Sequence, residues 1–317
     1  MLYRANDTGR AAVVTTYENP RTIDKELNMF VAFLFIPVVA GNVFMEGNIR
    51  NVPEITERES TSTKTYTIFD PCNTNKPGNR TRNCSQKKRR DRSESGECET
   101  YIRNDPVNVT CDMTSDGGGW TVIQRRSENE QGDNFFERNF TEYERGFGTP
   151  GESFWIGLEN LHALTSFPNN QQALRIELKR SDGRRDTIVV RYNKFHVASA
   201  KESYKLTIDE YDGPKGKKYD SLSGHNRSVF TIKESSKANP DRGSCFTEKE
   251  LLSGGWWFKD CNRANLNGRK FGLSTLKKPG ITWMIDGEAD SYSYIYHKVE
   301  MQIRDADYGF CTGSQKS

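Results

Sequence analysis

The residues most able to carry out chemistry lie in "GGWWFKDCNRANLNG", positions 254–268, where Cys261 follows two adjacent tryptophans. A cysteine in this setting is a nucleophile, a metal ligand or half of a disulfide. A Cys-His nucleophile needs a neighbouring imidazole, but the four histidines lie on unrelated predicted elements. There is no CxxC, no zinc-type Cys/His spacing, no nucleophile elbow and no P-loop. We therefore predict that the protein is not an enzyme and that Cys261 forms a disulfide with Cys245.

A single long apolar run, Met29 to Val43, precedes most of the polar sequence. Its most hydrophobic part is about half the length of a membrane span, so we interpret it as a signal peptide and expect no stable membrane anchor. Small residues at Val39-Ala40-Gly41 suit a cleavage site. A signal anchor and an apolar helix of the folded domain are the alternatives. Met29 is a candidate start beside Met1.

Cysteines and glycosylation sequons also favour a secreted, extracellular protein. The chain has seven cysteines, and disulfides persist on the secretory route. An odd count leaves at least one thiol free or bonded to another chain, which is a route to a homo-oligomer. Sequons that could carry glycans begin at Asn79, Asn83, Asn108, Asn139 and Asn226.

Charge excludes one class of partner. The 46 Lys+Arg residues nearly balance 43 Asp+Glu residues, for a net charge of +3, so we expect no nucleic-acid partner. The basic run Lys87 to Arg92 is interpreted as a solvated loop, with heparin binding and proteolytic processing as the alternatives.

The elements that must position these residues are short. Alternating apolar and charged residues predict strands, and leucines on one face predict a helix over Phe154–Thr165. Candidate capping boxes begin at Ser199 and Thr247, while residues 46–83 are Ser/Thr-rich and have the composition of a disordered linker. The class is therefore α+β with extensive loops. The predicted strands are Trp120–Arg126, Ala173–Arg180, Asp186–Tyr192 and Lys298–Arg304.

Several of these segments together resemble one family. The stretches 111–126, 135–165, 254–268 and 298–304 occur in the order found in the fibrinogen C-terminal globular domain. The resemblance implies a mixed, mainly antiparallel sheet, short helices and a loop-rich binding subdomain. Because no collagen stem is encoded, the chain looks more like tachylectin-type and ixoderin-type invertebrate lectins. The implied division is extension plus signal peptide 1–45, linker 46–83, fibrinogen-like domain 84–307 and tail 308–317.

In the lectins of this family a small pocket holds an acetyl group between aromatic rings and backbone N–H groups. Asp260-Cys261 matches the dipeptide that has an unusual cis bond there, and two tyrosines match the aromatic positions. Asn262 replaces a frequent histidine and Leu252 replaces an aromatic residue, so we expect altered selectivity. The predicted ligand pocket is Leu252, Asp260, Cys261, Asn262, Tyr292 and Tyr294.

The calcium loop of the family is poorly matched in "FTIKESSKANPDRGSC", Phe230 to Cys245. Neither alignment of this segment supplies two carboxylates, which calcium prefers. The remaining donors would be Asn239 and the carbonyls of Asp241 and Gly243, with Glu234 from outside the pattern. We expect no high-affinity calcium site and no other cofactor.

The resemblance also pairs Cys84 with Cys111, in addition to Cys245 with Cys261. Cys72, Cys98 and Cys311 are then left over. An intrachain bond from Cys98 to Cys72 or Cys311 would still leave one thiol, which could join two chains.

The predicted function is a lectin-like innate-immune protein that binds acetylated or related groups on microbial glycans. The alternative is a secreted non-lectin ligand of the angiopoietin-like or clotting-related type, which acts by protein–protein contact. Glycan binding competed by N-acetylglucosamine would distinguish the two.

Overall fold

A computed structural model describes the chain in two compact units, residues 1–76 with 310–317, and residues 77–309. The described residues are 2–5, 11–14, 55–59, 62–66, 80–90, 94–130, 132, 134–167, 170–180, 187–233, 253–259, 261, 263–270 and 280–308. In the first unit the chain forms two antiparallel hairpins. These are β1 (Leu2–Ala5) with β2 (Ala11–Val14), and β3 (Ile55–Glu59) with β4 (Ser62–Tyr66).

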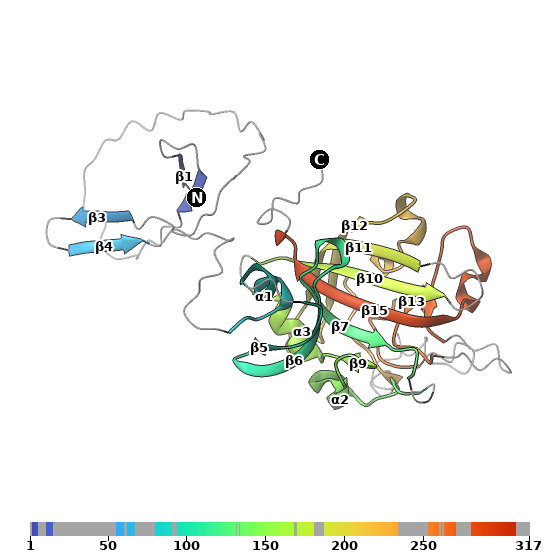
Figure 1. The fold of residues 1–317 in the computed structure, drawn as a ribbon. Coiled ribbons are helices and arrows are strands. Elements are labelled where there is room, and N and C mark those ends of the chain that lie inside the picture. The colour runs from blue at the N-terminus through green and yellow to red at the C-terminus, as the bar shows by residue number, and fades with distance from the viewer. Residues whose placement is uncertain are drawn as a thin grey trace. The chain divides into compact units, whose positions relative to one another are not determined.

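The second unit is built on a 9-stranded sheet whose described strand pairs are all antiparallel (Figure 1). Its main path runs β12-β11-β10-β15-β7-β6-β5, and β9 joins β8 to β7. This architecture confirms the predicted α+β class. The strands are β5 (Gly96–Ile102), β6 (Asp105–Asp112), β7 (Trp120–Arg126), β8 (Phe147–Gly148), β9 (Phe154–Trp155), β10 (Gln172–Arg180), β11 (Thr187–Val197), β12 (Leu206–Asp212) and β15 (Tyr296–Asp305).

The late strand β15 lies between β10 and β7, in the middle of the sheet (Figure 1). Its register places Met301 opposite Ile176 and Val299 opposite Leu178, and all four side chains are fully buried. Side chains alternate along a strand, so these apolar residues share one face of the sheet, while Glu300 and Gln302 between them on β15 are buried on the other face. The strands predicted from alternation are therefore present, within a few residues at their ends.

Three short α-helices accompany the sheet: α1 (Cys84–Arg90), α2 (Phe140–Arg145) and α3 (Leu158–Thr165). The helix predicted from Phe154 begins only at Leu158, because Phe154 and Trp155 pair with β7 and β8, and Gly157 has φ 97°. A capping box at α2, Asn139 with Glu142, is one that the sequence analysis missed. The Thr165 hydroxyl of α3 accepts a hydrogen bond from the backbone N–H of Val197, which holds the helix against β11.

The predicted capping box at Ser199 is wrong in detail. The chain forms only a 3₁₀ turn there, η2 (Ala200–Glu202), and the Ser199 side chain makes no capping bond. The second candidate, at Thr247, lies outside the described residues. Two further 3₁₀ helices, η3 (Gly216–Tyr219) and η4 (Ser223–His225), begin the loop-rich part of the domain, and η1 (Ser115–Gly117) precedes β7.

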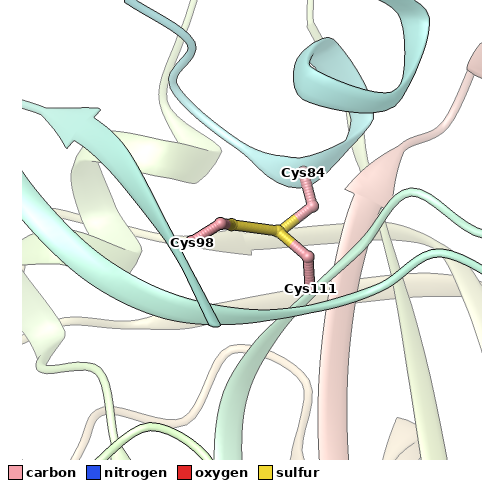
Figure 2. A group of neighbouring side chains, drawn as sticks. All are labelled: Cys84, Cys98 and Cys111. Carbon is pink, nitrogen blue, oxygen red and sulfur yellow. A yellow bond between two sulfur atoms is a disulfide. The ribbon is translucent and has the colours of Figure 1, made fainter. Parts of the chain in front are cut away.

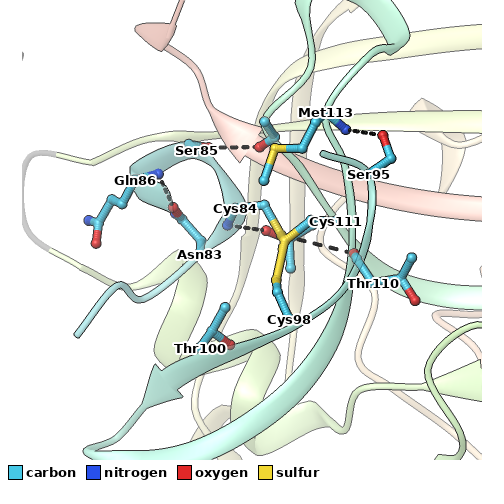
Figure 3. Close-up of a disulfide and its surroundings, with 12 residues drawn as sticks. Asn83, Cys84, Ser85, Gln86, Ser95, Cys98, Thr100, Thr110, Cys111 and Met113 are labelled. Carbon is cyan, nitrogen blue, oxygen red and sulfur yellow. Dashed lines mark hydrogen bonds between the residues drawn. A yellow bond between two sulfur atoms is a disulfide. The ribbon is translucent and has the colours of Figure 1, made fainter. Parts of the chain in front are cut away.

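The Cys84–Cys111 disulfide joins α1 to β6, as the family resemblance implied. Cys98 on β5 also lies at Cys111, so the three sulfur atoms form one cluster (Figure 2). Around it, the backbone N–H of Cys84 donates to the Thr121 hydroxyl at 2.9 Å, and the Ser95 hydroxyl accepts from the backbone of Met113 (Figure 3). The expected partners of Cys98, Cys72 and Cys311, lie outside the described residues.

The basic run was predicted to be a solvated loop, and this is wrong for Lys87 to Arg90, which form the last turn of α1. Lys88 donates to the carbonyls of Met113 and Gly117, while Arg89 forms ion pairs with Asp305 and Asp307. Lys88 therefore binds the turn before β7, and Arg89 binds the end of β15.

The sequon asparagines differ in environment. Asn83 is 3% exposed and its amide nitrogen donates to Asp305 at 2.8 Å, so we expect no glycan on Asn83 in the folded domain. Asn108 and Asn139 are exposed, Asn226 is half-buried, and Asn79 lies outside the described residues.

Candidate functional site

The Trp256-Trp257 pair forms the floor of the loop-rich region, since both rings are fully buried. Their centroids are 5.4 Å apart in an edge-to-face arrangement, and Trp257 also packs edge-on against Phe230. The Trp257 indole N–H donates to the carbonyl of Tyr204 at 2.7 Å. The pair therefore supports the loops above it and offers no surface to a ligand.

Gly254 and Gly255 allow this burial. Gly254 has φ 74°, and a Cβ on it would collide with the Asn267 carbonyl. The backbone N–H of Gly255 donates to the Tyr143 hydroxyl at 2.8 Å, where a side chain would meet Phe230. Burial raises the pKa of Tyr143 well above its ordinary value, so the phenol stays neutral. Close backbone approach is the physical reason for both glycines.

The segment that follows Cys261 is bound to β7 by side-chain amides. It includes the short strand β13 (Ala264–Asn265), which pairs with β14 (Thr282–Trp283). Asn267 donates to the Gly255 carbonyl at 2.9 Å and accepts from Gln124 of β7 at 3.1 Å. Asn265, Leu266 and Asn267 are fully buried, so this polar run forms a buried hydrogen-bonded network.

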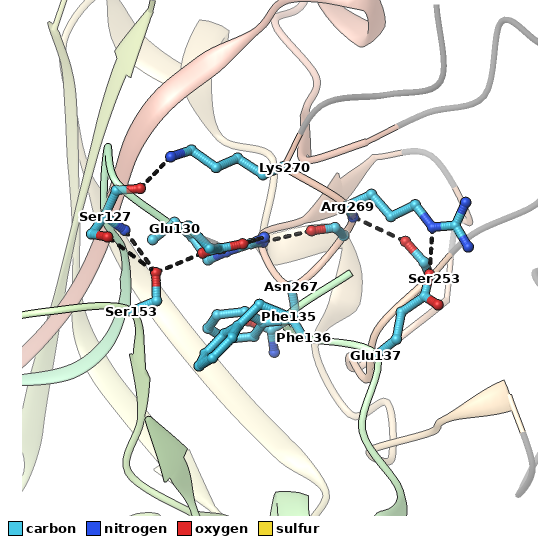
Figure 4. Close-up of polar contacts among 12 residues, drawn as sticks. Ser127, Glu130, Phe135, Phe136, Glu137, Ser153, Ser253, Asn267, Arg269 and Lys270 are labelled. Carbon is cyan, nitrogen blue, oxygen red and sulfur yellow. Dashed lines mark hydrogen bonds and ion pairs between the residues drawn. The ribbon is translucent and has the colours of Figure 1, made fainter. Parts of the chain in front are cut away.

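A buried ion pair completes this attachment (Figure 4). Arg126 makes a bidentate contact with Glu130, at 2.8 and 2.5 Å, and neither side chain has exposed surface. Arg126 also donates to the carbonyls of Leu266 and Gly268, while Lys270 donates to those of Ser127 and Glu128. These charged donors hold residues 266–270 against the sheet.

Cys261 is disulfide-bonded and half-buried. Its predicted partner Cys245 lies outside the described residues, as do the pocket residues Leu252, Asp260 and Asn262. The same holds for Asn239, Asp241 and Gly243, so the calcium prediction stays a prediction. His225 is fully buried and its Nδ1 lies 2.7 Å from the Trp257 carbonyl oxygen. This contact indicates a structural role for the imidazole.

The two predicted aromatic residues of the pocket have different environments. Both follow β14, in or just after the 3₁₀ helix η6 (Ala289–Ser293). Tyr292 is 37% exposed, and its hydroxyl lies 3.2 Å from the Met284 sulfur. The ring of Tyr294 is covered by the guanidinium of Arg180 at 3.5 Å, and its hydroxyl donates to Glu288 at 2.9 Å. Tyr294 is therefore part of a polar cluster, whereas Tyr292 faces solvent.

Lys218 extends this cluster through an ion pair with Glu288 at 2.7 Å. Hydrogen bonds from Lys218 and Tyr294 hold the pKa of Glu288 below its ordinary value, and the bond to Glu288 raises the pKa of Tyr294. Sequence reasoning missed these partners. No local signal connects Arg180 or Lys218 to a tyrosine so far along the chain.

We call the surface around η6 the η6 face. Its exposed apolar residues are Tyr292 and Ile295, which is 46% exposed. Charged pairs lie beside them, including Arg263 with Asp286 at 3.7 Å. An apolar centre with a polar rim is typical of surfaces that contact another protein. We define the η6 face as the contacting residues Lys218, Arg263, Met284, Asp286, Glu288 and Tyr292, together with Ile295, which follows η6.

Comparison with known proteins finds one family that matches most of the chain. Residues 80–306 match the family described as fibrinogen beta and gamma chains, C-terminal globular domain. The chain belongs to the fibrinogen C-terminal domain family. The prediction of the family is thereby confirmed.

The relatives found for this fibrinogen C-terminal domain include tenascin of Gallus gallus, 36% identical over 74% of the chain and 12% of tenascin. Angiopoietin-1 of Homo sapiens is 37% identical over 68% of the chain and 41% of angiopoietin-1. The chain thus spans less than half the length of these relatives. They differ in kind from the invertebrate lectins that the absence of a collagen stem suggested, and that finer resemblance stays a prediction.

Solved structures agree. The fibrinogen-like globe domain of human ANGPTL6 superposes with a TM-score of 0.60, at 30% identity, over 73% of this chain and 97% of that one. The corresponding domain of human ANGPTL2 gives 0.60 at 32% identity, over 71% and 99%. The fibrinogen-like fold is therefore shared along almost all of each known domain.

Proposed function

We propose that this protein is an extracellular, non-enzymatic ligand whose fibrinogen-like domain contacts a protein partner through the η6 face. The observation that carries the proposal is the exposure of Tyr292 and Ile295 beside a rim of charged pairs. Similarity to angiopoietin-1, tenascin and the ANGPTL globe domains supports the same class of function. Aromatic anchors surrounded by charge are common in protein-binding surfaces.

This proposal reverses the order of the two functions predicted from the sequence. An acetyl-binding pocket needs aromatic surface for the methyl group, but Arg180 covers the ring of Tyr294 and Glu288 occupies its hydroxyl. Of the pocket aromatics in the described residues, only Tyr292 keeps a large exposed surface. We therefore favour protein contact over recognition of microbial glycans as the function of this domain.

Secretion is part of the same proposal. Sequons and a disulfide-linked cysteine cluster fit an oxidising compartment. No helix among the described residues is both long and apolar enough to cross a membrane. The apolar run at Met29–Val43 lies outside those residues, and its removal as a signal peptide is a matter for N-terminal sequencing of secreted protein.

The test is binding of the secreted chain to an array of extracellular receptor and matrix proteins, in parallel with a glycan array. We expect the chain to bind a protein, and we expect N-acetylglucosamine not to compete with this binding. The double variant Tyr292→Ala/Ile295→Ser should bind that protein at least about tenfold more weakly, because it loses an aromatic anchor. Phe167→Ala is the matched control, because Phe167 is 41% exposed but lies against Arg82, outside the η6 face. Glycan binding that N-acetylglucosamine abolishes would restore the lectin function.

A further inference from the structure

The η6 face contains a methionine, Met284, directly after β14. Met284 is half-buried, whereas the other two methionines in the described residues, Met113 and Met301, lie in the core and are 4% and 0% exposed. Oxidation of a side chain requires access from solvent. Among the methionines that the structure describes, Met284 is therefore the accessible one.

Two hydrogen-bond donors converge on the Met284 sulfur. The Tyr292 hydroxyl donates to Sδ at 3.2 Å, and Arg263 Nη1 lies 3.9 Å from the same atom. The donors come from different segments, since Tyr292 belongs to η6 and Arg263 precedes β13. A thioether sulfur is only a weak acceptor. At this sulfur, two strong donors thus face a weak acceptor.

Backbone hydrogen bonds fix this arrangement. The Met284 backbone N–H donates to the Arg263 carbonyl at 2.8 Å and to the Ser221 hydroxyl at 3.1 Å. The next backbone N–H, that of Ile285, donates to the Ser291 hydroxyl of η6 at 3.0 Å. The sulfur and both of its donors therefore belong to one connected cluster.

We propose that Met284 is a site of oxidation by peroxide, and that Tyr292 and Arg263 hold the sulfoxide that forms. In this step a lone pair on Sδ attacks one oxygen of hydrogen peroxide. The S–O bond forms and the O–O bond breaks, while the proton on the transferred oxygen passes to the other oxygen, which leaves as water. Sulfur is oxidised by two electrons and the peroxide is reduced. The sulfoxide oxygen is a stronger acceptor than the thioether, and both donors already point at this position.

Oxidation makes this part of the η6 face polar. A sulfoxide replaces an apolar thioether and draws the hydroxyl of the exposed Tyr292 toward position 284. The effect on binding rests on the proposed function of the face. We expect the oxidised chain to bind its protein partner at least about tenfold more weakly, as when an interface anchor is lost.

The first experiment needs no partner. The full secreted chain is treated in its native state with dilute hydrogen peroxide, and the sulfoxide at each methionine is followed by peptide mass spectrometry. We expect Met284 to oxidise at least about tenfold faster than Met113 or Met301, because only Met284 is accessible. Equal rates at the three sites, or earlier oxidation of the two buried methionines, would overturn the proposal.

Tyr292→Phe tests whether the sulfoxide is held, since it removes only the donor hydroxyl. Oxidation should lower the thermal midpoint of this variant more than that of the unaltered chain, in which the sulfoxide keeps both donors. Tyr294→Phe is the matched control, because the Tyr294 hydroxyl donates to Glu288. The same shift on oxidation in all three chains would show that Tyr292 does not hold the sulfoxide.

Met284→Leu separates this oxidation from other effects of peroxide. Leucine has a similar volume and cannot form a sulfoxide, so the variant should bind the protein found on the array equally well before and after treatment. Effects of peroxide on cysteine are common to both chains. If both lose binding equally, Met284 does not regulate the face and the proposal is wrong. If neither binds a protein before treatment, the proposed function fails, while the mapping and the melting curves still decide the oxidation site.

Discussion

At the scale of single residues, the most consequential contact is the buried pair of Arg126 and Glu130. Removing one partner of such a pair leaves a desolvated charge, which typically costs about 3–5 kcal/mol of unfolding free energy. We expect Glu130→Gln to lower stability by about that amount, because Arg126 and its carbonyl contacts have no exposed surface. Denaturant unfolding measures the change.

Glu159→Gln is the matched control for this prediction. Glu159 pairs with Arg103, and the two side chains are 41% and 47% exposed, so its loss should cost no more than about 1 kcal/mol. Similar losses in the two variants would mean that burial of the Arg126–Glu130 pair does not govern its contribution.

A second residue-scale prediction concerns acid. Burial by itself would raise the pKa of Asp112, but hydrogen bonds from Ser115 and Thr114 outweigh it and hold the pKa well below its ordinary value. Asp112 Oδ1 accepts from both backbone N–H groups at 2.9 Å. Since the folded pKa is the lower one, the stabilisation is complete above pH about 4 and is lost as pH falls below it.

Asp112→Asn removes this titration. We expect the variant to be less stable than the unaltered chain at neutral pH and to lose less stability between pH about 5 and 2, measured as thermal midpoints. If the thermal midpoints of the two proteins fall equally as the pH is lowered, Asp112 contributes little to acid unfolding.

At the scale of elements, short helices depend on their ends. Asn139 caps α2, since its side chain accepts from the Glu142 backbone at 2.9 Å while Glu142 accepts from the Asn139 backbone at 3.1 Å. Asn139→Ala should therefore cost about 1 kcal/mol, within a usual span of about 0.5–2. Thermal or denaturant unfolding of secreted protein measures the loss.

The sequon supplies the control, because Thr141→Ala abolishes glycosylation at Asn139 and leaves the cap in place. We expect that variant to keep nearly full stability. Equal losses for Thr141→Ala and Asn139→Ala would assign the stabilisation to the glycan and not to the capping box.

At the scale of the whole molecule, the loop-rich region is bound to the sheet by protein contacts. Trp256, Trp257 and the Gln124–Asn267 hydrogen bond are all buried, and Cys261 is disulfide-bonded. In addition, neither alignment of residues 230–245 places two carboxylates at the calcium-ligand positions of the family. We therefore expect that stability and binding depend little on calcium.

Melting curves with millimolar calcium and with a chelator test this expectation. An ion present at about a hundred times its dissociation constant would stabilise the fold by about 2.7 kcal/mol, which such curves would register. We expect no shift of that size. A clear rise in melting temperature with calcium would mean that Asn239, Asp241 and Gly243 form a metal site after all.

Much of the sheet was predictable because strand formation leaves a local trace. Leu174, Ile176 and Leu178 alternate with polar residues, and their partners on β15 do the same, so both strands were found without knowledge of their pairing. The Cys84–Cys111 disulfide was predicted from the family resemblance, which rests on the order of several motifs along the chain. Element ends were less certain, since pairing of Phe154 and Trp155 with β7 and β8 shortened a helix that the leucine spacing had predicted.

By itself the sequence determined the family, the class of fold and the structural use of Cys261, because these depend on residue types and on spacing along the chain. Only the tertiary structure decided that Cys98 lies at Cys111, that Arg180 covers Tyr294, and that the basic run binds Asp305. Each of these is a contact between distant segments. Side-chain identity states what a residue is able to bind, but the fold alone sets which partner lies within a few ångströms and whether water is excluded from the contact.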